Sequence, residues 1–270
     1  EALLVGTSQT VTWTSNGSIA NVKLELSSDG QVSWLSIVDS TANDGSHPWT
    51  VPDIISSTCR LRVSDVDDPE ASDISNQNFK IMGSVTLTYP VGGEKWAVGS
   101  SQNVTWTRIG SIANVKLEYS NNGGTIYTAI TESTANDGSY NWTIPDAITT
   151  QGLLRISDAS DPTVSNTCAG FFKIQGSFEV TSPNGGEAWQ AASDQVITWN
   201  KNGSVGFVNL YYSKDSGVTW TPIADGQNTS NTGTFTWYSI PVDAVSTKAR
   251  VKVADSTDPD AFDMSNSDYK

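Results

Sequence analysis

Gln9-Thr-Val-Thr-Trp-Thr14 has two similar counterparts in the chain, Gln102-Asn-Val-Thr-Trp-Thr107 and Gln195-Val-Ile-Thr-Trp-Asn200. The tryptophan of each copy lies 93 residues from the tryptophan of the next. In each copy this Trp and the aliphatic residue two positions earlier alternate with other residues, so in an extended strand they share one face. The sequence therefore predicts one β-strand with a buried Trp, built three times.

The 93-residue period sets the domain organisation of the 270-residue chain. A fixed period of this kind is the signature of tandem repeats, and an immunoglobulin-type sandwich has roughly 100 residues. We therefore expect three domains, at residues 1–81, 82–174 and 175–270. An enzyme needs one asymmetric active site, whereas a protein that acts as a spacer needs copies of the same domain. The repeat itself therefore favours a structural role over an enzymatic one.

The second copy gives the clearest strand pattern, because short alternating segments are separated by Gly, Pro, Asn and Asp. Seven strands are expected, at 84–89, 101–107, 114–120, 127–130, 138–144, around Leu154 and Ile156, and at 172–174. No segment has a sustained helical stripe. This pattern predicts an all-β chain of three tandem Ig-like or fibronectin-III-like antiparallel β-sandwich domains arranged as a rod. The third copy is longer in two loops, at 226–233 and 242–248.

The first copy is expected to lack one strand. Glu1 aligns with Glu94 and Glu187, which follow a Gly-Gly turn, so the first copy has no equivalent of Ser84–Tyr89. An unpaired sheet edge invites pairing with another chain. Two explanations stay open: the chain is a piece of a longer tandem array, or a neighbouring subunit donates the absent strand so that chains polymerise through domain 1.

Charge and hydropathy exclude two classes of partner. The formal net charge is −14 and no cluster of Lys and Arg interrupts it, which argues against nucleic-acid binding. No apolar run of about 18 residues is present, so no membrane span is expected.

Paired aspartates before a proline recur in all three copies and are the candidate metal ligands. They are Asp65 and Asp68, Asp158 and Asp161, and Asp255 and Asp258. Carboxylate oxygens are what Ca²⁺ prefers, but it takes six to eight of them and nothing nearby supplies that many. Asp before Pro also initiates turns unaided, so calcium is a possible cofactor and the structural turn is the favoured interpretation.

Ser213-Lys-Asp-Ser-Gly-Val-Thr-Trp220 fits the turn pattern called an Asp-box, and residues 27–34 and 120–127 are degraded versions. The Asp or Asn is expected to accept hydrogen bonds from N–H groups of its own turn, the Gly to supply a positive φ, and the ring to pack beneath the hairpin. This interpretation assigns the motif to the fold and not to catalysis.

Groups with catalytic or redox chemistry are few. His47 is the only histidine, and Tyr140 and Phe235 stand at its position in the other copies. Triads, zinc spacings and nucleotide-binding motifs are absent, so no catalytic or cofactor-binding residue is predicted and we expect a non-enzymatic protein. Cys59 and Cys168 lie at different places in different repeats, which leaves buried free thiols or an intermolecular bond as alternatives.

Several segments of the second copy together resemble a family of Ig-like repeats. These are Tyr89–Trp96, Val104–Thr107, Val115–Ser120, Asn136–Trp142, Arg155–Asp158 and Phe171–Ile174. They resemble the Ser/Thr-rich surface repeat related to the N-terminal domain of cell-wall glucan-assembly proteins, which also occurs in tandem in large secreted prokaryotic proteins. The resemblance implies a β-sandwich in an extracellular or cell-surface setting, with no catalytic residues to carry over.

The leading functional hypothesis is a structural module, a stiff rod in a surface layer, stalk or fibre, with self-association or neighbouring repeats as its partners. Linkers as short as Met82-Gly83 and Gln175-Gly176 support it, because neighbouring sandwiches must then touch. The alternative is an adhesin or carbohydrate-binding accessory module of a larger secreted protein, with a surface polysaccharide as its ligand.

Overall fold

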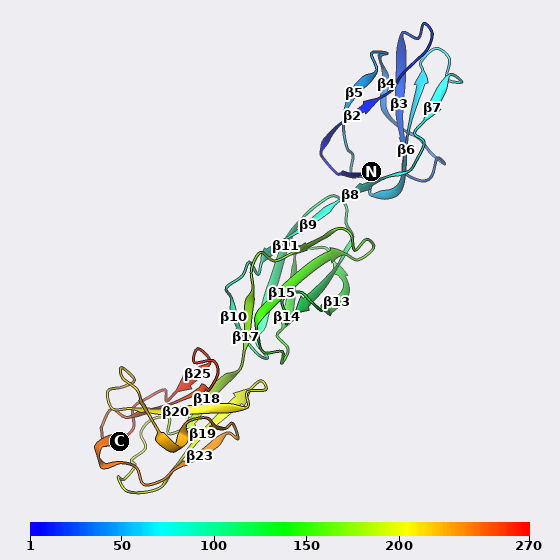
Figure 1. The fold of residues 1–270 in the computed structure, drawn as a ribbon. Helices are drawn as coiled ribbons and strands as arrows, with labels where there is room; N and C mark the ends of the chain where they lie inside the picture. The colour runs from blue at the N-terminus through cyan, green and yellow to red at the C-terminus, as the bar shows by residue number, and fades with distance from the viewer.

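The computed structural model describes residues 1–270 and is all-β. Figure 1 shows three β-sandwiches that follow one another in a row, with the N-terminus in the first and the C-terminus in the last. The only helical segments are two short 3-10 turns. The prediction of three tandem Ig-like β-sandwich domains is confirmed.

Domain 2 is a complete sandwich of nine strands. They are β9 (Ser84–Tyr89), β10 (Lys95–Ala97), β11 (Ser101–Ile109), β12 (Asn114–Ser120), β13 (Thr128–Ala135), β14 (Ser139–Thr143), β15 (Thr149–Asp158), β16 (Ser165–Thr167) and β17 (Phe172–Gln175). One sheet has the order β14-β11-β9, and the other has the order β10-β17-β15-β12-β13 with β16 beside β15. The sequence predicted seven strands and an antiparallel arrangement. It missed β10 and β16, each three residues long, and β10 pairs parallel to β17.

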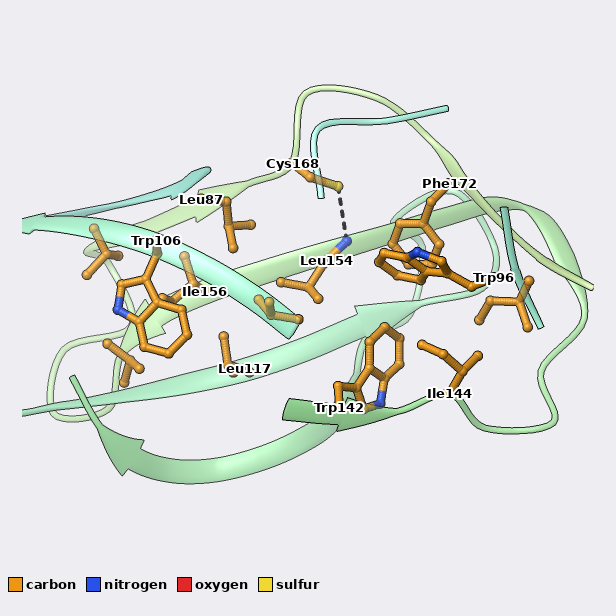
Figure 2. Packing of buried hydrophobic residues seen from close by; sticks show 14 of the residues in the cluster. Leu87, Trp96, Trp106, Leu117, Trp142, Ile144, Leu154, Ile156, Cys168 and Phe172 are labelled. Atoms are coloured by element: carbon orange, nitrogen blue, oxygen red, sulfur yellow. Dashed lines mark hydrogen bonds between the residues drawn. The ribbon is translucent and has the colours of Figure 1, made fainter. Parts of the chain in front are cut away.

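Aromatic side chains fill the core of domain 2 (Figure 2). Trp96 packs on Phe172 with ring centroids 4.6 Å apart and meets Trp142 edge-on at 5.8 Å. Trp106, from the repeated strand, is buried, and its indole N–H donates to Oδ1 of Asn136 at 2.6 Å. The repeated Trp thus contributes a large apolar surface, while Asn136 satisfies its one polar atom.

Domain 3 keeps this plan with altered loops. Its elements are β18 (Ser177–Ser182), β19 (Gln195–Asn202), β20 (Phe207–Ser213), β21 (Thr221–Pro222), η1 (Ala224–Gly226), β22 (Thr229–Ser230), β23 (Thr234–Trp237), η2 (Val242–Ala244), β24 (Arg250–Asp255) and β25 (Phe262–Met264). The counterpart of β13 is split into β21 and β22 with η1 between them. η2 lies within the expected insertion at 242–248, and η1 ends at Gly226, where the other expected insertion begins.

Domain 1 has only two strands in its smaller sheet. The strands of the whole domain are β1 (Ala2–Leu4), β2 (Ser8–Thr12), β3 (Asn21–Ser27), β4 (Leu35–Ala42), β5 (Ser46–Thr50), β6 (Ser56–Asp65), β7 (Ser72–Ile74) and β8 (Phe79–Met82). β2 pairs with β5 alone, because the counterpart of β9 is absent. The prediction that all three repeated tryptophans are buried is wrong for Trp13, which stays half-buried since no strand covers it.

Single glycines join the domains. β8 ends at Met82 and β9 begins at Ser84, so only Gly83 separates them, and Gly176 plays the same part between β17 and β18. The domain boundaries expected from the sequence, 81/82 and 174/175, fall within β8 and β17, one or two residues before these glycines.

Candidate functional site

Two junctions between the domains are built alike. At the first, the backbone N–H of Ser111 donates to Oδ1 of Asp53 at 2.8 Å, and the Ser111 hydroxyl donates to Oδ2 of the same carboxylate. At the second, Ser204 makes the same two bonds to Asp146, with the N–H bond at 2.9 Å. Each carboxylate therefore clamps the first loop of the following domain.

A close approach of the two chains at a glycine completes each junction. A side chain added at Gly110 would meet Oδ1 of Asp53 at 3.2 Å, Cα of Gly83 at 3.2 Å and Cγ2 of Val5 at 3.3 Å. At the second junction, one added at Gly203 would meet Cγ2 of Val98 at 3.0 Å and Cα of Gly176 at 3.3 Å. Both glycines have a positive φ, which favours Gly at this close approach.

A lysine crosses each junction to the aspartates that the sequence analysis singled out. Lys80 of domain 1 pairs with Asp161 of domain 2 and donates to Oγ1 of Thr163 at 2.8 Å. Lys173, at the same position in domain 2, pairs with Asp258 of domain 3. Burial raises the pKa of Asp161, but hydrogen bonds from Lys80 and Thr163 outweigh it and the net shift is downward.

All six candidate calcium ligands have a backbone partner within their own turns. In each case Oδ1 accepts the N–H of the residue two positions later, as in Asp158 to Ser160 at 2.8 Å and Asp255 to Thr257 at 2.8 Å, and likewise for Asp65, Asp68, Asp161 and Asp258. No group of three or more His, Cys, Asp or Glu side chains is placed to hold a metal ion. Calcium binding at these aspartates stays a prediction, which chelation can test.

We expect chelation with EGTA to leave the thermal midpoint of all three domains unchanged, because these carboxylates are held by N–H and lysine donors. Differential scanning calorimetry with and without added calcium measures this. A midpoint that rises with calcium and falls again with EGTA would instead support calcium binding at the aspartates.

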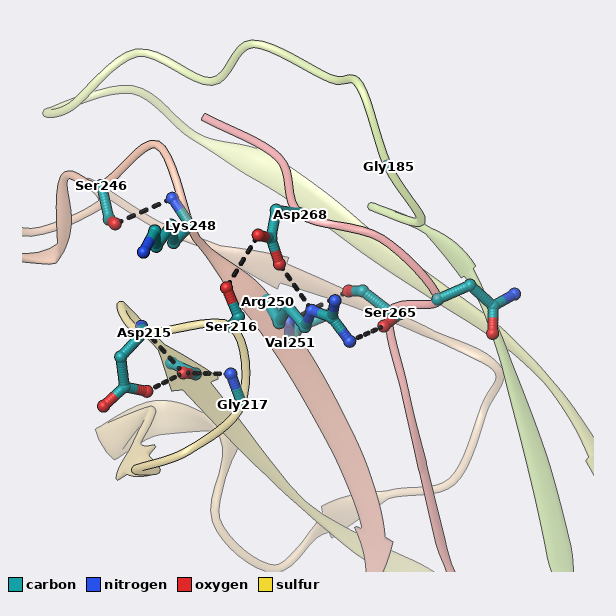
Figure 3. Close-up of polar contacts among 12 residues, drawn as sticks. Gly185, Asp215, Ser216, Gly217, Ser246, Lys248, Arg250, Val251, Ser265 and Asp268 are labelled. Atoms are coloured by element: carbon teal, nitrogen blue, oxygen red, sulfur yellow. Dashed lines mark hydrogen bonds and ion pairs between the residues drawn. The ribbon is translucent and has the colours of Figure 1, made fainter.

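The Asp-box turn of domain 3 has the hydrogen bond that its sequence predicts for the aspartate. Figure 3 shows the part of the turn around Asp215, Ser216 and Gly217. Oδ1 of Asp215 accepts the N–H of Thr219 at 2.8 Å, and the Ser213 hydroxyl accepts the N–H of Gly217 at 2.8 Å. Hydrogen bonds from Thr219, followed by Ser213, lower the pKa of Asp215 to about 2. The turn also contacts the end of the chain, since Ser216 donates to Asp268, which pairs with Arg250.

The aromatic residue of each turn packs beside a cation on the neighbouring strand. The Arg155 guanidinium lies 3.9 Å from the ring centroid of Tyr127, and Lys252 lies 4.8 Å from that of Trp220. In domain 1, Arg62 lies 4.3 Å from the ring of Trp34. One face of each ring is therefore covered by a charged group of its own domain.

Gln31 is the strained member of these turns. It has a φ of 77°, while the equivalent Gly124 and Gly217 have 87° and 89°. Because its side chain is exposed, replacing it loses no packing. We expect Gln31→Gly to raise the free energy of unfolding of domain 1 by about 1 kcal/mol, measured by urea denaturation. The matched change Gly124→Gln should lower the free energy of unfolding of domain 2. If both changes shift the free energy of unfolding in the same direction, the assignment of backbone strain to Gln31 is contradicted.

Neither cysteine forms a disulfide, and both are buried. Sγ of Cys168 accepts the N–H of Leu154 at 3.2 Å (Figure 2), and burial raises the pKa of its thiol. Ser75 and Ser265 accept the equivalent N–H in the other domains. Cys168 thus takes the place of a structural serine.

Domain 1 has a groove where domains 2 and 3 have β9 and β18. Its volume is about 570 Å³. It lies between the repeated strand and β6, with β7 at one side, and Val11, Trp13, Leu24, Leu61 and Val63 form its apolar lining. Its polar lining includes Glu1 and Asp73.

The open edge of domain 1 was predicted from the sequence, and the paired aspartates were recognised as turn residues or calcium ligands, but the junction clamp was missed. The sequence repeats both parts of the clamp, since Pro52-Asp53 returns as Pro145-Asp146, and Gly110-Ser111 returns as Gly203-Ser204. No rule of local structure links an Asp to a Ser 58 residues later, so only the repetition of both pairs could have indicated them.

Strand pairing and sheet order define this chain as a protein of tandem Ig-like β-sandwich domains. No family model matches the chain, so the resemblance to the cell-wall glucan-assembly family is not supported. No curated protein matches it either.

Among solved structures the chain is similar to multi-domain Ig proteins. One is the eight N-terminal Ig domains of Down syndrome cell adhesion molecule, at 8% identity and a TM-score of 0.33. All of this chain is covered in that match, but it spans only 39% of the other protein's chain. Another is the four N-terminal Ig domains of Dscam1 isoform 8.4, at 11% identity and a TM-score of 0.30, with 100% and 71% of the two chains covered. The structure contains no helix of the length and apolarity needed to cross a membrane.

Proposed function

We propose that the chain is a non-enzymatic structural module of the cell exterior, a stiff rod that sets the distance between whatever its two ends carry. The single observation behind this proposal is the repetition of the junction. Asp53 with Ser111, and Asp146 with Ser204, make the same pair of hydrogen bonds. A contact that served one pair of domains by chance would not recur in the next pair.

Short linkers restrict the angles between neighbouring domains. With one glycine between the last strand of a domain and the first strand of the next, the sandwiches touch and few interdomain angles remain. Ile55 and Met82 of domain 1 also pack against the core of domain 2. The clamp and the lysine pair then select one angle among those that the linker permits. The lysine pairs are half-buried at the surface of the junctions. Surface ion pairs contribute only about 0–1 kcal/mol each, so we assign these pairs a role in orientation more than in adhesion between domains.

Self-association is the finer part of the proposal. At the end of domain 1 remote from domain 2, Ser18 stands at the position of Ser111 and Ser204, and Asp68 at that of Asp161 and Asp258. Ser18 is exposed, and Ile19 is half-buried where its counterparts Ile112 and Val205 are buried. Domain 1 thus presents one half of a further junction, which fits end-to-end contact with another sandwich of this kind.

The geometry favours the rod over carbohydrate binding. Trp34, Tyr127 and Trp220 each have a cation of their own domain over one face of the ring, which leaves at most one face of each for a sugar to stack on.

Distances between the end domains test the rod directly. Spin labels are introduced through unnatural amino acids at Val32 and Val218, which occupy the same exposed turn position in domains 1 and 3. We expect double electron–electron resonance to give one narrow distance distribution. The control is a chain with a flexible Gly-Ser insertion beside Gly83. A wild-type distribution as broad as that of the control would overturn the proposal.

A further inference from the structure

The two junctions share the Asp–Ser clamp but differ in the contacts beside it. At the first junction, Ile55 packs against the buried cluster of domain 1 and also against that of domain 2. Met82, the last residue of β8, packs against the cluster of domain 2 as well. Two apolar side chains therefore connect the cores of domains 1 and 2.

The second junction has no such apolar connection. Ile148 stands at the position of Ile55, but it is 41% exposed and belongs to neither neighbouring cluster. The half-buried apolar residues that pack against the core of domain 3 all come from domain 3 itself. Gln175 stands at the position of Met82, and its Oε1 atom is buried without a hydrogen-bond partner. Because a buried oxygen without a donor costs free energy, this side chain opposes the close contact that Met82 favours.

Charged side chains lie at the second junction instead. Lys173 of domain 2 pairs with Asp258 of domain 3 and lies 3.6 Å from Asp260. Asp260 also pairs with Lys95 of domain 2 at 2.6 Å. The hydrogen bond and the charge of Lys95, followed by the charge of Lys173, lower the pKa of Asp260, so this carboxylate is ionised at neutral pH. Four charges thus form one network across the junction.

The first junction has only one ion pair, that of Lys80 with Asp161. Ala2 and Thr163 stand there at the positions of Lys95 and Asp260. The two junctions therefore hold the same clamp in different surroundings, which are mainly apolar at the first and mainly ionic at the second.

Exposure makes the ionic network sensitive to salt. The side chains of Lys95 and Asp260 are 55% and 56% exposed, while those of Lys173 and Asp258 are 16% and 20% exposed. Dissolved ions screen exposed pairs, and the screening length falls from about 10 Å at 0.1 M salt to about 3 Å at 1 M. High salt therefore weakens the attraction across the second junction. The apolar contact at the first junction carries no charge and is not screened.

We propose that the second junction is a hinge whose opening is controlled by ionic strength, while the first junction stays fixed. When salt screens the network around Asp260, the rod bends at one place, between domains 2 and 3. Domains 1 and 2 continue to move as one unit because Ile55 and Met82 connect their cores. The inference rests on the proposed rod and assigns different behaviour to its two joints.

Spin labels at one turn position in each domain test the two junctions separately. Val32, Thr125 and Val218 occupy this position and are exposed. Double electron–electron resonance is recorded for each neighbouring pair of labels at about 0.1 M and about 1 M sodium chloride. Between domains 2 and 3, we expect the fraction of molecules outside the main distance peak to rise about fivefold at the higher salt. Between domains 1 and 2, the distribution should not change.

Two substitutions exchange residues between the junctions. Asp260→Thr introduces the residue that the first junction has, and it should broaden the domain 2–3 distribution at about 0.1 M salt and remove most of its response to salt. Gln175→Met removes the buried oxygen without a partner, and it should narrow that distribution at the higher salt. Asp225→Thr is the control, because it removes the same charge from the exposed side of η1, which lies beside β20 and β23. This control should respond to salt as the wild type does.

Three outcomes would overturn the inference. They are equal broadening at both junctions at high salt, a domain 2–3 distribution that salt leaves unchanged, and an Asp260→Thr chain that keeps the salt response of the wild type. The rod proposal fails on a different result, namely broad distributions at both junctions at about 0.1 M salt. A chain that is narrow at both junctions at every salt concentration would keep the rod and exclude the hinge.

Discussion

Replacing Trp142 with Ala is expected to lower the free energy of unfolding of domain 2 by about 3–5 kcal/mol and to leave domains 1 and 3 folded. Trp142 is 4% exposed and packs against Trp96, Tyr119 and Phe172, with ring centroids between 5.2 and 6.2 Å away. Truncation therefore removes a large apolar surface and leaves a cavity that rigid neighbouring rings cannot fill.

The three separate hydrophobic clusters explain why the damage should stay local. Trp142 belongs to a cluster of 17 buried residues, all from domain 2. Hydrogen exchange followed by mass spectrometry measures opening domain by domain, and faster exchange is expected in residues 84–175 alone. Trp220→Ala in domain 3 is the control, since that ring is only half-buried and should cost far less. Simultaneous loss of protection in all three domains would contradict independent cores.

The sequence predicted the elements whose signals are local. Alternation of apolar residues placed the strands around Trp106, Val115 and Trp142, because a sheet with one buried face imposes a period of two. Asp-box residues predicted a turn for the same reason, since Asp215 and its donors lie within a few positions of one another. Strands of three residues, such as β10 and β16, are too short to show any period.

Other features depend on what lies beside a residue in space. The sequence around Trp13 matches that around Trp106, yet Trp13 is half-buried because the covering strand is absent. The aspartates of the Asp-Pro turns were recognised as candidate ligands, but the partner of Asp161 is Lys80 of another domain, 81 positions earlier. Pairing between domains has no local pattern, so the structure was needed to identify it.

Domain 3 shows which parts of the repeat are free to vary. Tyr211 replaces the buried Glu118 of domain 2, and Lys252 lies 4.5 Å from its ring where Arg155 pairs with Glu118. Desolvation lowers the pKa of Lys252, as expected for an ammonium group that rests on a ring without a carboxylate. The ionic contact on this face can therefore be exchanged for an aromatic one, whereas the clamp is kept at both junctions.

Substituting Asn for Gly110 and Gly203 together is expected to release the fixed angles between the domains. Asn tolerates a positive φ better than most residues, so the backbone strain is small and the added side chain is the main effect. At Gly203 the first atom of that side chain would already lie 3.0 Å from Cγ2 of Val98, and at Gly110 it would lie 3.2 Å from Oδ1 of Asp53. The loop must move away from the preceding domain, which costs about 1–3 kcal/mol per junction and separates the clamp.

Gly17 offers a matched control for this substitution. It stands at the same position in domain 1 with a φ of 91°, and a side chain added there meets nothing within 4 Å. Gly17→Asn therefore places Asn at the same positive φ, with the same cost in backbone free energy as at Gly110 and Gly203, but it changes no junction. Spin-label distances between Val32 and Val218 should broaden markedly in the Gly110→Asn, Gly203→Asn chain and stay as narrow as wild type in Gly17→Asn. Equal distributions in the two variants would mean that the linker glycines alone hold the domains in line, and that the Asp–Ser clamp contributes nothing to the stiffness.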